Sequence, residues 1–335
     1  MMNKFFLPTL ILCCLPLPPH GGEVFISSRS ANLVKAQAEQ RKEARASAMP
    51  PNQREDPGYT LKSEVKLVNV FVTVTTPRGQ PVGDLKKEDF GLLEDGAPQT
   101  ISVFRRESQL PLSIVLAIDA SLSTRKDIKL EAASAQRFAH SILRGGDGLS
   151  LYEFTENVTE LLPFTSDLNR VDRAIGRMKI GAATALYDAI YLASQRLEER
   201  RGRKVLVLIS DGGDTASKTD YSAAVRAAQE AEAIVYSIIV VPIAADAGRN
   251  TGGEHALIQL STDTGGKHFY AESPMELDKA FRQISDELRT QYLLAYYPVK
   301  RLSDSEFRSI RVNVSHNRGS LRVAHRSGYY TSRPR

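Results

Sequence analysis

The sequence predicts an α/β fold, a doubly wound and mostly parallel sheet, inserted in or flanked by a small β-sandwich. Between residues 109 and 289, short runs that are apolar at nearly every position alternate with stretches of helical spacing. Such runs are typical of parallel strands that helices cover on both faces. The flanking segments instead alternate apolar and polar residues, as half-buried antiparallel strands do.

The length and composition agree with a folded protein of more than one domain. The chain has 335 residues, and at about 150 residues per domain this length predicts about two domains. Hydrophobic residues make up 42% of the chain and charged residues 25%, which is enough apolar material for a buried core. The two cysteines, Cys13 and Cys14, are adjacent, so the folded part has no disulfide framework, cysteine zinc site or catalytic thiol.

The N-terminal segment predicts export. Residues 1–22 place one lysine before an apolar stretch and then proline and glycine, which is the layout of a secretory signal peptide. The apolar stretch is too short for an ordinary membrane-spanning helix. We therefore expect a periplasmic, cell-surface or secreted protein, with acylation of Cys13 or Cys14 as an alternative. Residues 23–59 have no sustained apolar stripe and are predicted to be a flexible linker.

The first flanking segment, residues 60–108, contains period-2 alternation around VKLVNVFVTVTT, followed by turns that contain glycine. The last segment, residues 290–335, returns to strand patterns in QYLLAYYP, FRSIRVNVSH, SLRVAHR and GYY. Each set of strands is too small to bury a two-sided core by itself. We therefore expect both segments to form one β-sandwich, with residues 109–289 inserted between them as the α/β domain.

The inserted segment alternates strand and helix patterns along its whole length. The expected strands cover residues 112–118, 148–154, 158–164, 204–210, 234–241 and 267–270. The expected helices cover residues 127–143, 167–178, 185–200, 221–231, 254–262 and 275–288. This order predicts that connections cross from one strand to the next over both faces of the sheet.

Oxygen-bearing side chains follow two of the expected strands and precede one helix. In an open α/β sheet, functional groups gather outside the carboxyl ends of the strands. Asp119, Ser121 and Ser123 follow the first strand of the inserted segment, Thr184 precedes a helix, and Asp211 follows a later strand. Such donors suit a hard divalent cation, Mg²⁺ or else Mn²⁺ or Ca²⁺, and need no histidine or cysteine. We expect Asp119 to be a solvent-facing loop carboxylate that contributes little to the core.

These residues resemble a known metal site. DASLS at residues 119–123, the threonine of GAATALYDAI and the aspartate of ISDGGD resemble the metal-ion-dependent adhesion site of von Willebrand factor type A domains. The resemblance covers about residues 108–290, and the flanking strands with YLLAYYP resemble a bacterial subgroup of related secreted proteins. It implies an adhesion or protein–protein interaction module with no catalytic residues, whose protein partner presents an Asp or Glu carboxylate to the metal. It also implies that one of the two aspartates acts through a water.

Each of these residues also has a structural interpretation. Ser123 and Thr184 are suitable helix N-caps, and Asp211 is suitable as a turn residue before glycine. Asp188 and Asp214 are the nearest further carboxylates, and we interpret them as helix or turn residues rather than ligands. The joint occurrence of all parts of the motif favours the metal site.

Two other functions stay open. A Mg²⁺-dependent phosphatase would use Asp119 as its nucleophile, but it needs a general acid two residues later, where Ser121 stands. A structural scaffold whose metal only stabilises the fold is the other alternative. Nucleotide-binding glycine motifs are absent after the first strand of the inserted segment.

The distribution of charged residues along the chain indicates which classes of partner the protein can bind. Residues 300–335 carry 9 basic and 2 acidic residues of the 44 and 39 in the chain, so the remainder, with 35 and 37, is nearly neutral. A nearly neutral body argues against nucleic-acid binding. The basic C-terminal strands allow contact with an anionic envelope or extracellular surface, although arginines on the solvent-facing side of a sheet are the commoner explanation.

Overall fold

The computed structural model describes residues 67–106, 110–121, 128–241, 251–300, 306–315 and 319–331. The predicted signal peptide (1–22) and linker (23–59) lie outside the described residues, as does Ser123. Among the described residues, no helix is both long and apolar enough to cross a membrane.

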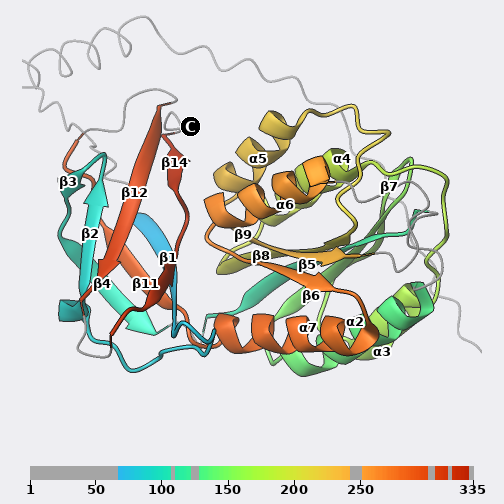
Figure 1. Ribbon diagram of the computed structural model, residues 1–335, viewed down its shortest axis with the longest axis horizontal. Coiled ribbons are helices and arrows are strands. Elements are labelled where there is room, and N and C mark those ends of the chain that lie inside the picture. Colours follow the sequence, from blue (N-terminus) through green and yellow to red (C-terminus); the bar gives the residue numbers. More distant parts are fainter. Residues whose placement is uncertain are drawn as a thin grey trace, which may run out of the picture. The chain divides into compact units, whose positions relative to one another are not determined.

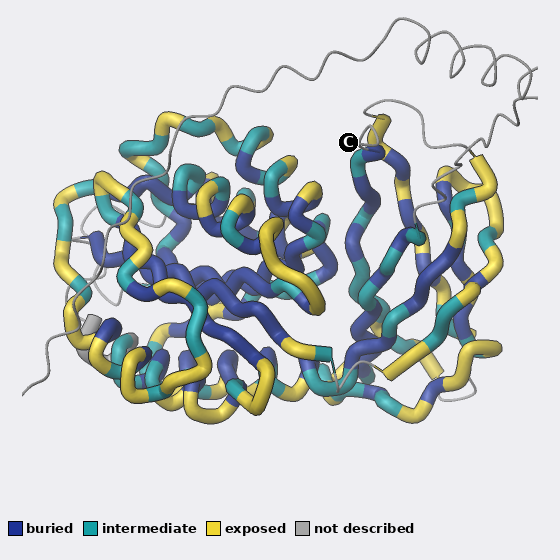
Figure 2. Tube along the Cα trace, turned by 180° about the vertical axis from the view of Figure 1, so that it is seen from behind, coloured by how far each residue is buried: buried dark blue, intermediate teal, exposed yellow. Residues whose placement is uncertain are grey.

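A six-stranded sheet forms the centre of the α/β part (Figure 1). Its strands are β5 (Leu112–Asp119), β6 (Gly148–Phe154), β7 (Val158–Thr165), β8 (Arg203–Ser210), β9 (Ala233–Val240) and β10 (His268–Ala271). They lie in the order β10-β9-β8-β5-β6-β7, and all neighbours are parallel except β7, which is antiparallel to β6. Every residue of β5, β6 and β9 is buried, as Figure 2 shows for the middle of the sheet.

Helices cover both faces of this sheet (Figure 1). One face carries α2 (Ile128–Ile142), α3 (Leu168–Ile175) and α7 (Pro274–Leu288), and the other carries α4 (Leu186–Glu198), α5 (Tyr221–Glu230) and α6 (Thr251–Asp263). On the first face, the rings of Phe138 and Phe281 stack with centroids 4.4 Å apart and join α2 to α7. The predicted doubly wound α/β fold is therefore confirmed.

Two antiparallel sheets of four strands form the remainder. Their strands are β1 (Val68–Thr75), β2 (Phe90–Glu94), β3 (Ala97–Pro98), β4 (Ile101–Arg106), β11 (Tyr292–Tyr296), β12 (Phe307–Val314), β13 (Arg322–Ala324) and β14 (Gly328–Tyr330). The sheets have the orders β13-β1-β11-β4 and β14-β12-β2-β3, so each combines strands from before and after the α/β part. The domain boundaries at residues 60, 108 and 290 stay predictions.

A buried polar network joins these strands. Arg308 on β12 donates from Nη1 to Oε1 of Glu94 on β2 over 2.9 Å, and both side chains are almost inaccessible to solvent. The hydroxyls of Tyr296 and Tyr329 donate to the other oxygen of Glu94, at 2.5 and 2.9 Å. Burial raises the pKa of both tyrosines, so they stay protonated donors. The network therefore requires strands from both flanks to be in place together.

A second buried arginine lies where the α/β part joins the β-strands on either side. Arg203, the first residue of β8, is 0% exposed. Its guanidinium donates to the carbonyl of Leu110, which lies two residues before β5, at 3.0 Å, and to the carbonyl of Leu288, the last residue of α7. One side chain therefore holds both connections at the amino edge of the six-stranded sheet.

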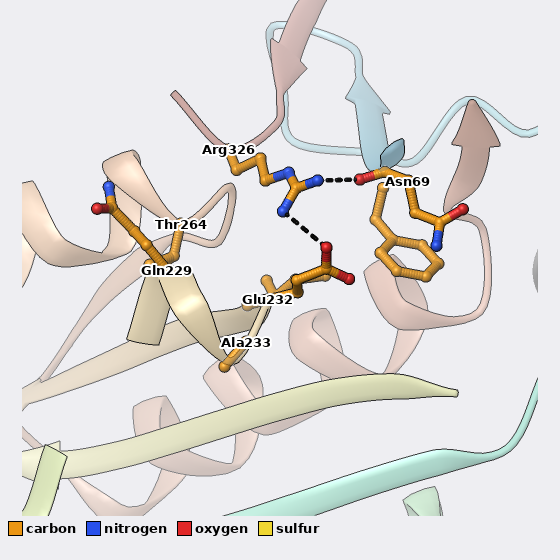
Figure 3. A pocket seen from close by; sticks show the side chains of 8 residues that line it. Asn69, Gln229, Glu232, Ala233, Thr264 and Arg326 are labelled. Carbon is orange, nitrogen blue, oxygen red and sulfur yellow. Dashed lines mark hydrogen bonds and ion pairs between the residues drawn. The ribbon is translucent and has the colours of Figure 1, made fainter. Parts of the chain in front are cut away.

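Arg326 adds a further contact at that edge (Figure 3). Its guanidinium donates to the carbonyl of Asn69 on β1 and lies 3.4 Å from Oε1 of Glu232, just before β9. The cavity beside it measures about 20 Å³, which is room for about one water rather than a ligand. Next to it, the amide of Ser327 donates to the carbonyl of Asp263 at the end of α6.

Replacing the buried arginine should destabilise the protein. In Arg203→Met the carbonyls of Leu110 and Leu288 lose a charged donor, so we expect the free energy of unfolding to fall by about 2–4 kcal/mol. Arg201, an exposed neighbour, provides the control. Arg201→Met should change the free energy of unfolding by less than about 0.5 kcal/mol. Urea unfolding followed by circular dichroism measures both, and equal effects would contradict the assigned role.

The first set of β-strands should not fold without the second. In a fragment of residues 60–108, β1 and β4 lack β11, and β2 lacks β12. Since β1 and β4 then lose all their neighbouring strands and β2 keeps only the two-residue β3, we expect no cooperative thermal transition. Circular dichroism of the fragment tests this, and a sharp transition would mean that this segment is a domain of its own.

Candidate metal centre

The carboxyl ends of β5 and β8 position both aspartates. These strands are parallel neighbours, and Ile118 pairs with Ile209. Asp119 therefore ends β5 beside Ser210, the last residue of β8, and Asp211 follows directly. The pKa of Asp119 is raised mainly by burial, and the negative charge of Asp211 adds a smaller contribution.

Asp119 is fully buried, so the expectation of a solvent-facing loop carboxylate was wrong. Its Oδ1 accepts a hydrogen bond from the amide of Ser121 at 3.0 Å, and its Oδ2 accepts one from the hydroxyl of Ser210 at 2.7 Å. Burial raises the pKa of Asp119 to about 6, because it outweighs the opposing effect of these hydrogen bonds. The residue is buried because it still belongs to a central strand that helices cover on both sides. A cation beside this carboxylate would offset the cost of its burial.

Ser210 is a positioning residue that sequence reasoning missed. Besides donating to Asp119, its hydroxyl accepts a hydrogen bond from the amide of Gly212 at 3.1 Å. It therefore connects the Asp119 carboxylate to the loop that carries Asp211. The available signal was a serine at the end of the otherwise apolar run VLVLIS, directly before the predicted ligand.

The Asp211 loop packs closely against the start of α6. Gly212 has φ +85°, and a Cβ at this position would lie 2.7 Å from the carbonyl carbon of Gly253. A Cβ at Gly253 would likewise lie 1.7 Å from the carbonyl oxygen of Gly212. The amide of Gly213 donates to Oδ1 of Asp211 at 2.9 Å. The close backbone packing and this hydrogen bond together fix the backbone from which the Asp211 side chain extends.

Thr184 is not the N-cap of the following helix. Helix α4 begins at Leu186, its N-cap is Ala185, and no side chain makes a cap hydrogen bond there. Instead, Oδ1 of Asp214 accepts from the amide of Tyr187 at 3.3 Å. The N-terminus of α4 is thus partly capped by the loop that follows β8, and the Thr184 hydroxyl is not used for that purpose.

The two further carboxylates hold loops together. Asp214 also accepts from the hydroxyl of Ser217 at 2.5 Å. Asp188 accepts from the amides of Lys218 and Thr219 at 3.0 and 2.8 Å. Both aspartates therefore act as structural residues of the helix and the turn, in agreement with their interpretation from the sequence.

Backbone hydrogen bonds join the three segments that carry the predicted ligands. The amide of Thr215 donates to the carbonyl of Thr184 at 2.8 Å, and the hydroxyl of Thr215 accepts from the amide of Thr184 at 3.0 Å. The amide of Gly181 donates to the carbonyl of Ala120, between Asp119 and Ser121, at 2.9 Å. The loops of Asp119, Thr184 and Asp211 therefore form one connected assembly at the carboxyl edge.

The donors in this assembly fit a hard cation. Two carboxylates and the hydroxyls of Ser121 and Thr184 are all oxygen ligands, which Mg²⁺, Mn²⁺ and Ca²⁺ prefer. The described residues contain no cluster of three or more His, Cys, Asp or Glu, so a metal held here would depend on hydroxyls as well as carboxylates. The fifth predicted ligand, Ser123, lies outside the described residues.

Neutralising Asp119 should stabilise the metal-free protein. The folded-state pKa of Asp119, about 6, lies above the ordinary 3.8, so ionisation of Asp119 opposes folding. This penalty is complete above about pH 6, decreases as the pH falls, and disappears below about pH 3.8. In chelator at pH 7.5, Asp119→Asn should raise the free energy of unfolding by about 1–3 kcal/mol. The gain should vanish near pH 4.

Urea unfolding at several pH values measures this gain. The control is Asp147→Asn, since both oxygens of the buried Asp147 accept from backbone amides, of Leu112 and Arg144, and one of these bonds is lost on substitution. Beside Asp119 the hydroxyl of Ser210 can instead turn and accept a hydrogen bond from the new side-chain amide. Destabilisation by Asp119→Asn at every pH would contradict the interpretation.

The comparisons with known proteins agree with the fold. Residues 114–214 match the von Willebrand factor type A domain family. No curated protein matches the chain. Among solved structures, BatB from Bacteroides thetaiotaomicron is 18% identical, with a TM-score of 0.43, over 52% of this chain and 98% of that one.

Two further solved structures are similar at comparable levels. The von Willebrand factor domain of the type V pili tip protein Mfa5 from Porphyromonas gingivalis is 16% identical, with a TM-score of 0.45, over 52% of this chain and 94% of that one. A von Willebrand factor type A protein from Catenulispora acidiphila is 11% identical, with a TM-score of 0.48, over 73% of each chain. The family match lies on the strands and loops that carry Asp119, Thr184 and Asp211, and the α/β part of this chain has a fold like that of von Willebrand factor type A domains.

Proposed function

We propose that this protein is an exported interaction module that binds an acidic group of a protein partner through a divalent cation. The cation would be held by Asp119, Ser121, Ser123, Thr184 and Asp211. The observation that supports the proposal is that hydrogen bonds join the three loops that carry the buried Asp119, Thr184 and Asp211. Export rests on the signal-peptide layout of residues 1–22.

The donor set leaves room for a ligand. Mg²⁺ prefers six oxygen ligands, and five side chains that each supply one oxygen leave at least one position for water or an incoming carboxylate. Two carboxylates balance the charge of a divalent cation, while the hydroxyls add none, so an anionic ligand is not repelled strongly. A carboxylate of a partner is therefore the ligand chemistry that fits best.

The geometry favours binding over phosphate transfer. Both oxygens of Asp119 accept hydrogen bonds, from the amide of Ser121 and the hydroxyl of Ser210, which suits a carboxylate held in place as a metal ligand. Ser121, at the position where a phosphatase needs a general acid, has no suitable pKa for that task. The proposal therefore includes no turnover, and hydrolysis of p-nitrophenyl phosphate that depends on Asp119 would contradict it.

The basic C-terminal strands give little support to a membrane-surface function. Arg308 is buried and paired with Glu94, and Arg326 is buried and lies beside Glu232. Only part of the local basic excess therefore faces water. We favour the metal centre as the place where a partner binds.

Titration calorimetry of the full chain with Mg²⁺ and Mn²⁺ tests the metal site. We expect Thr184→Val to weaken binding at least about tenfold, because it removes one ligand oxygen at constant volume, and Thr184→Ser to retain it. Thr262→Val is the control, since Thr262 donates to the carbonyl of Ile258 on the exposed side of α6. No binding below the millimolar range, or equal affinity in Thr184→Val, would overturn the metal site.

A pulldown from envelope extract with and without chelator tests the mode of partner binding. Proteins retained by the full chain should be lost both in chelator and in Thr184→Val. Raised salt should weaken binding only modestly, since the body of the protein is nearly neutral. Binding that survives chelator and collapses in moderate salt would assign the contact to the basic C-terminal strands instead.

A further inference from the structure

The loop of residues 177–183 runs between α3 and Thr184 and lies against the candidate metal centre. Its Gly181 donates to the carbonyl of Ala120, one residue from Asp119. A Cβ at Gly181 would lie 2.3 Å from the Cβ of Thr155, so only glycine fits this approach. The loop is therefore pressed against the segments that form the metal centre.

Two carboxylates hold the backbone of this loop. Oε2 of Glu153, a buried residue of β6, accepts from the amide of Lys179 at 2.7 Å. Oε2 of Glu156 accepts from the amide of Ala182 at 3.0 Å. Backbone hydrogen bonds, first to its own amide and then to that of Ala182, lower the pKa of Glu156 and keep it ionised. Because both acceptors are carboxylates, these two hydrogen bonds restrain the loop before any ligand arrives.

This rigid loop presents an apolar side chain to solvent. Ile180 is 43% exposed and lies between the two amides that the glutamates hold. Arg177 and Lys179 on the same loop are exposed as well. A single exposed isoleucine is common on protein surfaces and is not informative by itself. Ile180 is informative because the hydrogen bonds that hold the loop also hold its backbone. The next residue, Gly181, makes the bond to Ala120.

We infer that the 177–183 loop selects the sequence around the metal-bound carboxylate, an inference that rests on the proposed function. The ligand is an acidic peptide segment in which an aliphatic residue next to the Asp or Glu packs against Ile180. Arg177 and Lys179 favour further negative charge in that segment. The metal recognises the carboxylate, and the loop recognises what surrounds it.

The distances allow both contacts at once. Asp119 and Ile180 are each next to one partner of the hydrogen bond between Ala120 and Gly181. Their Cα atoms are therefore at most about 13 Å apart. An extended ligand advances about 3.4 Å per residue, so a residue one to three positions from the carboxylate reaches Ile180. Since the loop is already ordered, little conformational entropy is lost when the ligand binds.

Synthetic peptides serve as the probe for this loop. Each fluorescent, capped peptide contains one Asp and carries Leu or Gly at one of the three positions on either side. With the full chain in Mg²⁺, we expect one Leu position to give about tenfold tighter binding than Gly, and chelator to abolish binding of both. A peptide with two added Glu residues should bind more tightly at 0.05 M than at 0.3 M NaCl.

Three variants isolate the role of Ile180. Ile180→Ser should remove the preference for Leu and leave both the affinity for the Gly peptide and the affinity for Mg²⁺ unchanged. Ile180→Val should keep most of the preference. Leu192→Ser is the matched control, because Leu192 is 41% exposed on α4 and does not belong to the loop, and it should behave like the unchanged protein.

The outcomes separate the two proposals. If Mg²⁺-dependent binding occurs with no preference for Leu, or if Ile180→Ser keeps the preference, the role of the loop is overturned and the metal-bridged function stands. If Mg²⁺ binds but no acidic peptide does, the bridging function fails, and the role of the loop fails with it. If Mg²⁺ itself does not bind, the metal centre fails first.

Discussion

The guanidinium of Arg203 holds together the place where this chain crosses from β-strands into the α/β domain and back. It binds the carbonyls of Leu110 and Leu288, which mark the two crossings, at the amino edge of the six-stranded sheet. Arg326 and Ser327 make their contacts near the start of β9 and the end of α6, at the same edge. Because the contacts of Arg203, Arg326 and Ser327 all lie at the amino edge, they leave the carboxyl edge to the loops of the candidate metal centre. The insertion therefore determines where a partner can approach.

At Asp119, the stability of the fold and the charge needed to bind a cation make opposite demands. Hydrogen bonds from Ser121 and Ser210 favour its ionised form, but burial and the charge of Asp211 outweigh them and raise the pKa to about 6. A side chain chosen for stability alone would be neutral at the end of a central strand. The contact between Gly212 and Gly253, where only glycine fits, similarly costs conformational freedom and holds the loop that begins with Asp211 against α6. A cation at this edge would resolve the conflict, which is why these features support a binding site and not a structural turn.

The sequence predicts the fold class well, because continuous apolar runs and helical spacing are local patterns that the buried sheet preserves. It also locates Asp119 and Asp211, since both directly follow such runs. It does not predict that Ser210 positions Asp119, or that Asp214 partly caps α4 in place of Thr184. These contacts join residues that are far apart in the chain, and a local pattern carries no information about which loop reaches across to which helix. The burial of Asp119 was missed for a different reason, because the strand extends one polar residue beyond its apolar run.

A metal-bound carboxylate cannot by itself distinguish one acidic partner from another. Discrimination is a difference between affinities, so it must come from groups around the metal that differ in their contacts with each ligand. Long-range attraction contributes little here, because the body of the protein has nearly equal numbers of basic and acidic residues. A flexible loop would lose entropy with every ligand and would adapt to many of them. A loop whose amides are held by Glu153 and Glu156 keeps Ile180 in one place, and a ligand without an apolar residue at the matching position gains nothing from it. The two glutamates thus contribute to selectivity without touching the ligand.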